Sequence, residues 1–389
     1  MSRLVVLLLI LLPVVLPAHE PDAHAAPPTA PGASAAFDHE GRLWLADVAA
    51  GQVRLRHSDD LGRSFSAPVP VNAEPENIDH TGENRPKLVF GPDGELYLSW
   101  SQRRPGKWAS FVRFARSLDG GRHFSAPITV HRDLGEITHG FDALAVDAAG
   151  RPVVAWIDAR DHAAAMRDGT SYAGLAVRYA WSDDRGATFQ PERKLADHSC
   201  ECCRLAVARA PDGQVAVLFR AISGSDVRDH AYAELPTDGS APRVARATFS
   251  DWQVAACPEQ GPGLAFGAEG ARHAVWFEAA HGPALWYGRL DPGQAPRHLL
   301  KLGAGGARHP DVAASGRSVW VAWNQVGADG YALMLRSSVD GGATFTAPRA
   351  IATSTAAVST PQLLLRDGRA WVAWSTARGF RLVPAADVP

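Results

Sequence analysis

The chain has 389 residues, of which 46% are hydrophobic and 21% are charged, and its formal net charge is -2. Charges of both signs are scattered along it, so it has neither the basic stripe of a nucleic-acid-binding protein nor a polybasic membrane patch. These properties argue against nucleic acid as a partner. We expect a monomer that binds a small molecule, a glycan or a metal ion.

Residues 1–25 have the pattern of a cleavable export signal. Arg3 precedes an apolar run from Leu4 to Leu16, and Ala23-His24-Ala25 places small residues at the cleavage positions. The run is shorter than the about 20 residues that cross a bilayer, although Pro13 and Pro17 leave an uncleaved anchor as an alternative. We therefore predict a periplasmic or secreted protein without stable membrane insertion.

Residues 36–389 contain seven repeats of an alternating strand that follows a turn ending in glycine. These glycines are Gly41, Gly94, Gly150, Gly213, Gly270, Gly316 and Gly368. Five of the strands end in tryptophan: Trp100, Trp156, Trp276, Trp323 and Trp374. Alternation with a period of two is typical of half-buried strands, and units of about 50 residues fit four-stranded propeller blades. The fold class is therefore all-β, a β-propeller with seven blades by repeat count.

The last repeat supplies only three strands, within 362–383. We expect the segment before Phe37 to add the missing outer strand and so close the ring; residues 26–35 are then a linker or a closing strand.

A second motif, S-x-D-x-G-x-x-F, follows the third strand of four repeats. Its copies are Ser58, Asp60, Gly62, Phe65; Ser117, Asp119, Gly121, Phe124; Ser182, Asp184, Gly186, Phe189; and Ser338, Asp340, Gly342, Phe345. Ser and Asp side chains can cap the turn amides, and the glycine takes φ > 0. The motif resembles the Asp-box (BNR) repeat of sialidases and related propellers. Sialidases have six blades, which makes six the alternative count, and the boxes are expected to be structural rather than functional.

In a propeller, the residues just before each innermost strand converge at one mouth of the axis. Those segments are 80–85, 139–142, 198–204, 257–260, 308–309 and 359–360. The candidate ligand-binding residues on them and on the accompanying loops are Arg85, Asp142, Arg204, Arg220, Arg228 and His309.

All four cysteines belong to this set. Cys200, Cys202 and Cys203 precede the fourth blade and Cys257 precedes the fifth, so adjacent loops bring them together. An even count in an exported protein favours disulfides, but three cysteines within four residues would need one tight local bridge. Thiolates placed together also suit a thiophilic metal, copper or zinc. His198, His139 and His230 are candidate additional ligands in that case.

The resemblance to sialidases implies a set of catalytic residues that can be sought in this sequence one by one. Such an enzyme has an arginine triad for a carboxylate, a tyrosine nucleophile with a neighbouring glutamate, and an aspartate as acid/base. Arg85 lies in a partial match, Asn-Arg-Pro, and Arg204 and Arg220 stand as further arginines. No tyrosine follows Tyr331, so the nucleophile is missing. An exo-α-sialidase-like glycoside hydrolase remains an alternative, with Arg85 and Arg204 around an acidic sugar and Asp142, Asp158 or Glu278 as the acid.

The region of the fourth repeat resembles a group of bacterial exported sialidase-like propellers. The residues that carry this likeness are Cys200-x-Cys202-Cys203-Arg204, Arg220, Arg228-Asp229, Asp251-Trp252 and Cys257-Pro258. Arg228-Asp229 and Asp158-x-Arg160 are expected to form ion pairs in loops. The leading hypothesis is an exported propeller that binds a ligand at a cysteine-rich axial mouth and is non-catalytic or of unknown activity. A protein-interaction scaffold is the third alternative and predicts an apolar rim.

Overall fold

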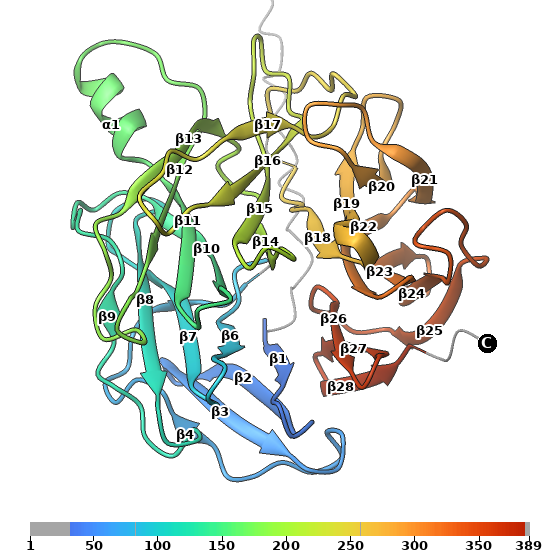
Figure 1. Ribbon diagram of the computed structural model, residues 1–389, viewed down its shortest axis with the longest axis horizontal. Helices are drawn as coiled ribbons and strands as arrows, with labels where there is room; N and C mark the ends of the chain where they lie inside the picture. The colour runs from blue at the N-terminus through green and yellow to red at the C-terminus, as the bar shows by residue number, and fades with distance from the viewer. Residues whose placement is uncertain (1–31, 82, 257, 386–389) are drawn as a thin grey trace, which may run out of the picture.

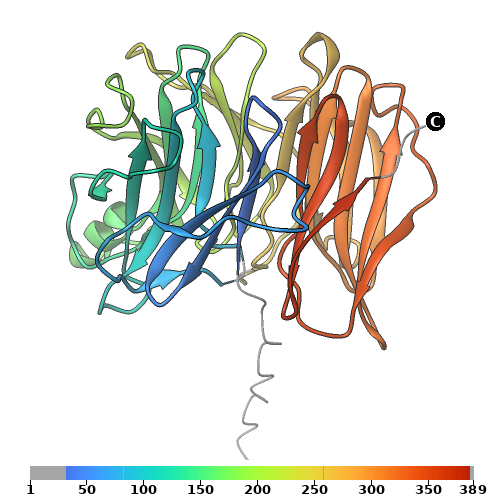
Figure 2. The same cartoon turned by 90° about the horizontal axis from the view of Figure 1, so that it is seen from below.

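The computed structural model describes residues 32–81, 83–256 and 258–385. In these residues, seven antiparallel sheets surround a central axis (Figure 1). The side view shows the strands running between two faces of the ring (Figure 2). The predicted seven-bladed β-propeller is therefore confirmed, and the alternative of six blades is wrong. The proposed signal residues 1–25 lie outside the described residues, so that part of the sequence analysis stays a prediction.

The first three sheets contain strands β1 to β13. The first has β1 (Ser34–Phe37), β2 (Leu43–Ala49), β3 (Gln52–Ser58) and β4 (Val69–Pro70). The second has β5 (Ile78–Asp79), β6 (Lys87–Phe90), β7 (Leu96–Arg103), β8 (Ser110–Ser117) and β9 (Ile128–Thr129). The third has β10 (His139–Val146), β11 (Pro152–Asp158), β12 (Leu175–Trp181) and β13 (Arg193–Ser199), with helix α1 (Arg160–Arg167) between β11 and β12.

The last four sheets contain strands β14 to β28. The fourth has β14 (Ala206–Arg209), β15 (Val215–Arg220), β16 (His230–Leu235) and β17 (Val244–Arg246). The fifth has β18 (Gly263–Phe266), β19 (Arg272–Glu278), β20 (Ala284–Leu290) and β21 (Arg297–Ala304), with a short 3-10 helix at Ala268–Gly270. The sixth has β22 (Ala307–Ser315), β23 (Ser318–Gly327), β24 (Gly330–Ser338) and β25 (Arg349–Ser354). The seventh has β26 (Gln362–Arg366), β27 (Arg369–Thr376) and β28 (Gly379–Pro384).

The ring closes differently from our expectation. Ser34–Phe37 forms β1, which pairs with β2 as the innermost strand of the first sheet and is not an outer strand of the seventh. Only residues 38–42 separate β1 from β2, so a local hairpin forms before any distant pairing. Ala35 and Leu364 belong to one apolar cluster, which packs β1 against β26. Side-chain packing between the first and seventh sheets therefore joins the described ends of the ring.

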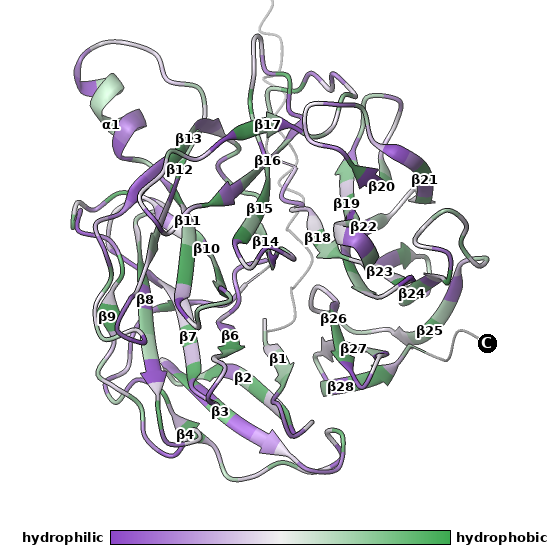
Figure 3. Ribbon diagram, viewed as in Figure 1, coloured by the Kyte–Doolittle hydropathy of each residue, from purple (hydrophilic) through white to green (hydrophobic). Residues whose placement is uncertain are grey.

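Buried side chains of the strands hold the blades together. The tryptophans Trp100, Trp156, Trp323 and Trp374 are at most 1% exposed, and Figure 3 shows hydrophobic residues concentrated along the strands. The indole Nε1 of Trp156 donates to Asp158, and that of Trp374 donates to Asn324. The tryptophans predicted from the repeat are thus core residues of the blades. Among the described residues, no helix is long and apolar enough to cross a membrane.

The four Asp-box hairpins have the hydrogen bonds expected from their sequence. The amide of each box glycine donates to the box serine Oγ over 2.7 to 2.9 Å. Each box glycine has φ near +80°, where L-residues are strained. Because the boxes follow the third strand of their blades, the strand order puts them on the face opposite to the beginning of the inner strands.

Candidate functional site at the axial mouth

The inner strands begin at one face, and here we call this face the axial mouth. At this face several inner strands are irregular. In the second sheet the strand is split into β5 and β6, with residues 80–86 between them. β10 has a bulge between Gly140 and Ala143, and β22 has one between Arg308 and Asp311. A bulge redirects the side chains next to it. These irregularities turn Glu83, Asp142 and His309 away from the regular strand pattern.

Glu83 is the centre of a buried ion cluster that spans the axis. Its Oε1 lies 2.9 Å from Nδ1 of His309 and accepts a hydrogen bond from the guanidinium of Arg204. Its Oε2 accepts from the amide of Gly261 at 2.6 Å. Arg204 also donates to the carbonyl of Pro310 at 2.7 Å. One carboxylate, 7% exposed, thus joins the second, fourth, fifth and sixth blades.

The charges of this cluster shift each other's proton affinities. Burial disfavours the charged form of Glu83, but Arg204 and His309 outweigh it and lower the pKa of Glu83 to about 2. Burial, together with the positive charge of Arg204, lowers the pKa of Arg85 to about 10. Burial raises the pKa of Asp311 although Arg204 opposes this. Arg85 and Arg204 are therefore neighbours at the mouth, as the sequence predicted.

Arg85 has fewer partners than Arg204. Its Nη1 donates to Oγ1 of Thr360 at 2.6 Å, which joins the second blade to the seventh. Among the described residues, Thr360 is the hydrogen-bond partner of the Arg85 side chain. The backbone carbonyl of Arg85 accepts a hydrogen bond from Lys87. The guanidinium of Arg85 therefore keeps hydrogen-bonding capacity for a ligand.

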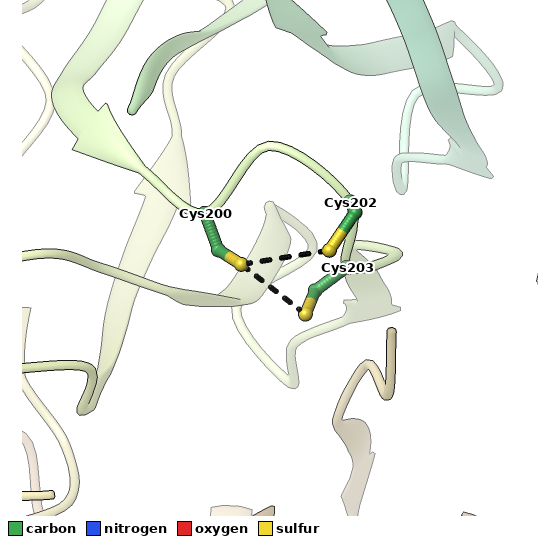
Figure 4. A group of neighbouring side chains, drawn as sticks. All are labelled: Cys200, Cys202 and Cys203. Carbon is green, nitrogen blue, oxygen red and sulfur yellow. Dashed lines mark hydrogen bonds between the residues drawn. The ribbon is translucent and has the colours of Figure 1, made fainter. Parts of the chain in front are cut away.

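The three cysteines of the fourth blade lie together beside this cluster. Sγ of Cys200 is 3.5 Å from Sγ of Cys203 and 3.9 Å from Sγ of Cys202, as Figure 4 shows. The three sulfurs lie within 4.8 Å of one another, and within the described part of the chain no histidine belongs to this ligand group. Cys200 and Cys203 are buried and free. Cys257, predicted to join them, lies outside the described residues.

Two arginines place positive charge against the sulfurs. Nη1 of Arg228 donates to Sγ of Cys200 at 3.3 Å, and its Nε donates to the carbonyl of Val254. The hydrogen bond from Cys203, with help from Arg220 and Arg228, lowers the pKa of Cys200 to about 6, and the same contact raises the pKa of Cys203. These contacts thus favour the thiolate form on Cys200 over that on Cys203.

Arg220 is fixed beneath the cysteine loop rather than open to a ligand. It is 1% exposed and donates to the carbonyls of Arg228, Gln260 and Phe277. Its guanidinium lies 5.2 Å from the ring centre of Trp252. These contacts link the fourth and fifth blades and leave Arg220 as a fixed charge near the sulfurs.

One of the two expected loop ion pairs is wrong. Asp229 pairs with Arg246 and accepts hydrogen bonds from Thr248 and Ser250, whereas Arg228 reaches Cys200 and Glu201. Consecutive residues of an extended segment point to opposite sides, so Arg228 and Asp229 face different partners. The other expected pair, Asp158 with Arg160, forms at 2.9 Å.

The candidate acids have different surroundings. Oδ2 and Oδ1 of Asp142 accept from Ser99 at 2.6 Å and Ser101 at 3.0 Å. Asp158 is fully buried, and although burial opposes ionisation, His139 and Arg160 lower its pKa well below the ordinary value. Glu278 is 5% exposed, and its Oε2 has no hydrogen-bond partner among the described residues.

The histidines expected as extra metal ligands have other surroundings. Nδ1 of His198 lies 2.9 Å from the carbonyl of Ala173, and Nδ1 of His139 lies 3.0 Å from Asp158. His230 is buried, and burial lowers its pKa well below the ordinary value.

The rim of the mouth is mixed in character. Trp108 is 80% exposed on the loop between β7 and β8, and Leu134 is 63% exposed on the loop before β10. Lys107 and Glu136 beside them are exposed as well. Trp108 has φ of +61°, an unfavourable conformation for a side chain of this size. On these described loops, exposed apolar side chains therefore stand beside exposed charged ones.

Sequence reasoning missed three members of the charged cluster. These are Glu83 and Lys87, each two residues from Arg85, and Asp311, two residues from His309. Their closeness in sequence to candidate residues could have identified them. The inner strands also line an open pocket of about 360 Å³, to which Ala35, Leu88, Leu264, Val312 and Leu363 contribute among others.

No family model and no curated protein matches the sequence. Solved structures do match the fold. An ulvan lyase, a polysaccharide lyase solved with a saccharide of glucuronic acid and sulfated rhamnose, has a TM-score of 0.57 at 10% identity, covering 90% of this chain and 91% of its own. A protein of unknown function from Dyadobacter fermentans has a TM-score of 0.51 at 14% identity, covering 80% and 94%.

A Hadza microbial sialidase has a TM-score of 0.50 at 14% identity, covering 87% of this chain and 74% of its own. At these identities the likeness concerns the fold. The fold of this chain is that of the sialidase-like β-propellers.

Proposed function

We propose that the protein is an exported ligand-binding propeller whose axial mouth holds a thiophilic metal ion, Cu(I), on the thiolates of Cys200 and Cys203. The observation that carries this proposal is that these two free, buried cysteines have Sγ atoms 3.5 Å apart. Soft thiolate ligands favour Cu(I), zinc and iron–sulfur clusters. Structural zinc sites have four ligands in almost every case, so two thiolates on one short loop fit Cu(I) with a low coordination number better.

The charges around the sulfurs support the same site. Two thiolates and one Cu⁺ leave one negative charge, and Arg228 in contact with Cys200 and Arg220 nearby supply the positive charge that balances it. Buried charge needs such compensation. Burial of Cys200 and Cys203 also keeps water away from the bound ion.

The location of the protein is part of the proposal. The pattern of residues 1–25 is that of an exported protein, and a compartment outside the cytoplasm exposes the site to environmental copper. Periplasmic or extracellular residence is tested by fractionation of cells that express the full chain.

The metal proposal is tested by loading reduced protein with Cu(I) in competition with a chromogenic Cu(I) chelator. We expect one equivalent in the unmodified protein and none in Cys200→Ser/Cys203→Ser. Ser225→Ala, an exposed change on the loop between β15 and β16, is the control and is expected to bind as the unmodified protein does. Equally negligible copper in all three contradicts the proposal, and a preference for zinc over copper in the same assay contradicts the choice of ion.

A second candidate function is the binding or cleavage of an acidic saccharide at the same mouth. The guanidinium of Arg85, with Thr360 as its side-chain partner, favours it because arginine recognises carboxylates. Arg204 would assist, with Asp142, Asp158 or Glu278 as the acid. The ulvan lyase and the sialidase that share the fold act on saccharides, which is consistent with this alternative.

Product release from a panel of sialosides and uronic-acid glycosides tests the second function. We expect Arg85→Met to abolish any release and the exposed change Arg132→Met to leave it unchanged. No release by the unmodified protein contradicts a catalytic role. Saccharide binding without release, lost in Arg85→Met, would retain the site as a binding site.

A further inference from the structure

We infer that Cys200 and Cys203 form an oxidation site, at which a small hydroperoxide converts the two thiols into a disulfide. This reaction removes both sulfurs proposed to hold Cu(I), so it would release the ion. The release rests on the proposed function, whereas the oxidation does not.

The geometry brings the two sulfurs close to bonding distance. They lie on either side of a turn, three residues apart, with their Sγ atoms 3.5 Å apart. A disulfide has an S–S length of about 2.05 Å, so the sulfurs must approach by roughly 1.5 Å. Rotation of two side chains on one short loop can supply an approach of this size.

The surroundings assign different roles to the two sulfurs. Arg228 donates a hydrogen bond to Sγ of Cys200 at 3.3 Å, and its guanidinium is held by the carbonyl of Val254. Positive charge in contact with a sulfur favours the thiolate, which is the nucleophile. Cys200 is therefore the attacking sulfur, and Cys203 is the resolving one.

The reaction has two balanced steps. The Cys200 thiolate attacks the hydroperoxide, an S–O bond forms, the O–O bond breaks, and hydroxide leaves with a sulfenic acid on Cys200. Sγ of Cys203 then attacks the Cys200 sulfur, and the S–O bond breaks. The Cys203 proton and the sulfenic hydroxyl leave as water. The two thiols supply two electrons, and the hydroperoxide accepts them.

Burial selects the size of the oxidant. Cys200 is 0% exposed and Cys203 is 1% exposed, so a protein disulfide cannot reach either sulfur in the folded state. A hydroperoxide the size of hydrogen peroxide needs only a local opening of the loop. Cys202, with its Sγ 3.9 Å from that of Cys200, is the other sulfur near it.

Peptide mapping of the unmodified, metal-free protein tests the inference without any mutation. After treatment with hydrogen peroxide, free thiols are alkylated, and the protein is cleaved after Glu201. This cut separates Cys200 from Cys202 and Cys203, so a disulfide of Cys200 appears as the Cys200 fragment joined to the fragment that holds Cys202 and Cys203. Fragmentation of the joined species then shows whether Cys202 or Cys203 is the partner. We expect the Cys200–Cys203 link, reversed by a reducing agent.

Variants separate the roles of the two sulfurs. In Cys203→Ser we expect a sulfenic acid on Cys200 that a dimedone probe captures, and in Cys200→Ser we expect neither link nor capture. Arg228→Met is expected to slow the oxidation about tenfold, the value of one charge-assisted hydrogen bond. Arg132→Met is the matched control, because its side chain is exposed and lies on another blade.

A link from Cys200 to Cys202, or full alkylation of both Cys200 and Cys203 after peroxide, would overturn the inference. A Cys200–Cys203 link in a protein that never binds Cu(I) would keep the oxidation site and contradict the proposed function. Release of bound Cu(I) with the same time course as formation of the link supports both.

Discussion

Carboxylates on the two faces of the propeller are held by different kinds of partner. In the first Asp-box, Asp60 accepts hydrogen bonds from Ser58 and Ser64, at most four positions away in the chain. At the axial mouth, Glu83 is held by Arg204, Gly261 and His309, which are 121, 178 and 226 positions away. The first arrangement can form within one hairpin, whereas the second exists only when the ring has closed.

This difference indicates what each face contributes. The Asp-box hairpins repeat the same bonds four times and stabilise single blades. The mouth gathers charges from several blades beside the sulfurs of one loop, and this is where we place the chemistry. Substitutions on the two faces should therefore have different consequences.

Glu83→Gln is expected to have the largest effect on stability. It leaves Arg204 as a buried charge without its partner, and breaking a buried ion pair costs roughly 3–5 kcal/mol. The free energy of unfolding, measured with a chemical denaturant, should fall by about that amount. Glu74→Gln, on the exposed segment before β5, is the control and should change it by less than about 0.5 kcal/mol. Equal effects of the two changes would contradict the role of Glu83 as a link across the axis.

Acid should weaken the mouth through the same group. The pKa of Glu83 is lowered in the folded state to about 2, from an ordinary value of 4.5. A depressed carboxyl pKa contributes stability that is complete above the unfolded value and is lost as the pH falls. The contribution, roughly 3 kcal/mol for such a shift, should disappear between pH 4.5 and 2. Unfolding curves of the unmodified protein and Glu83→Gln should converge over that window; a constant difference would argue against the assignment.

Ser182→Ala should have the smallest effect of the three. Ser182 is fully buried, accepts from the amide of Gly186 at 2.7 Å and donates to Asp184 at 2.7 Å. Loss of such bonds costs about 1–2 kcal/mol. We expect this loss in the free energy of unfolding together with unchanged Cu(I) loading, measured as for the cysteine variants. Reduced copper loading in Ser182→Ala, with the fold retained, would mean that the two faces are coupled.

The sequence could predict which residues lie at the axial mouth, but it could not predict which of them contact one another. The repeat placed the blade-joining segments at one face, and this located Arg85, Arg204, His309 and the three cysteines of the fourth blade. It did not reveal Glu83, because a lone glutamate in a loop has no local pattern. The expected pairing of Arg228 with Asp229 was wrong for a related reason: neighbours in sequence face opposite sides of an extended segment, and Arg228 is turned toward Cys200.

The sequence alone determined the blades, because alternation, turn glycines and Asp-box capping act over a few residues and repeat along the chain. It also determined the neighbourhood of Cys200, Cys202 and Cys203, which lie within four residues. The tertiary structure decided how the ring closes, with β1 in the first sheet, and which charges meet over the axis. Those contacts join residues from different blades, so their geometry depends on the bulges and on the packing of the whole ring.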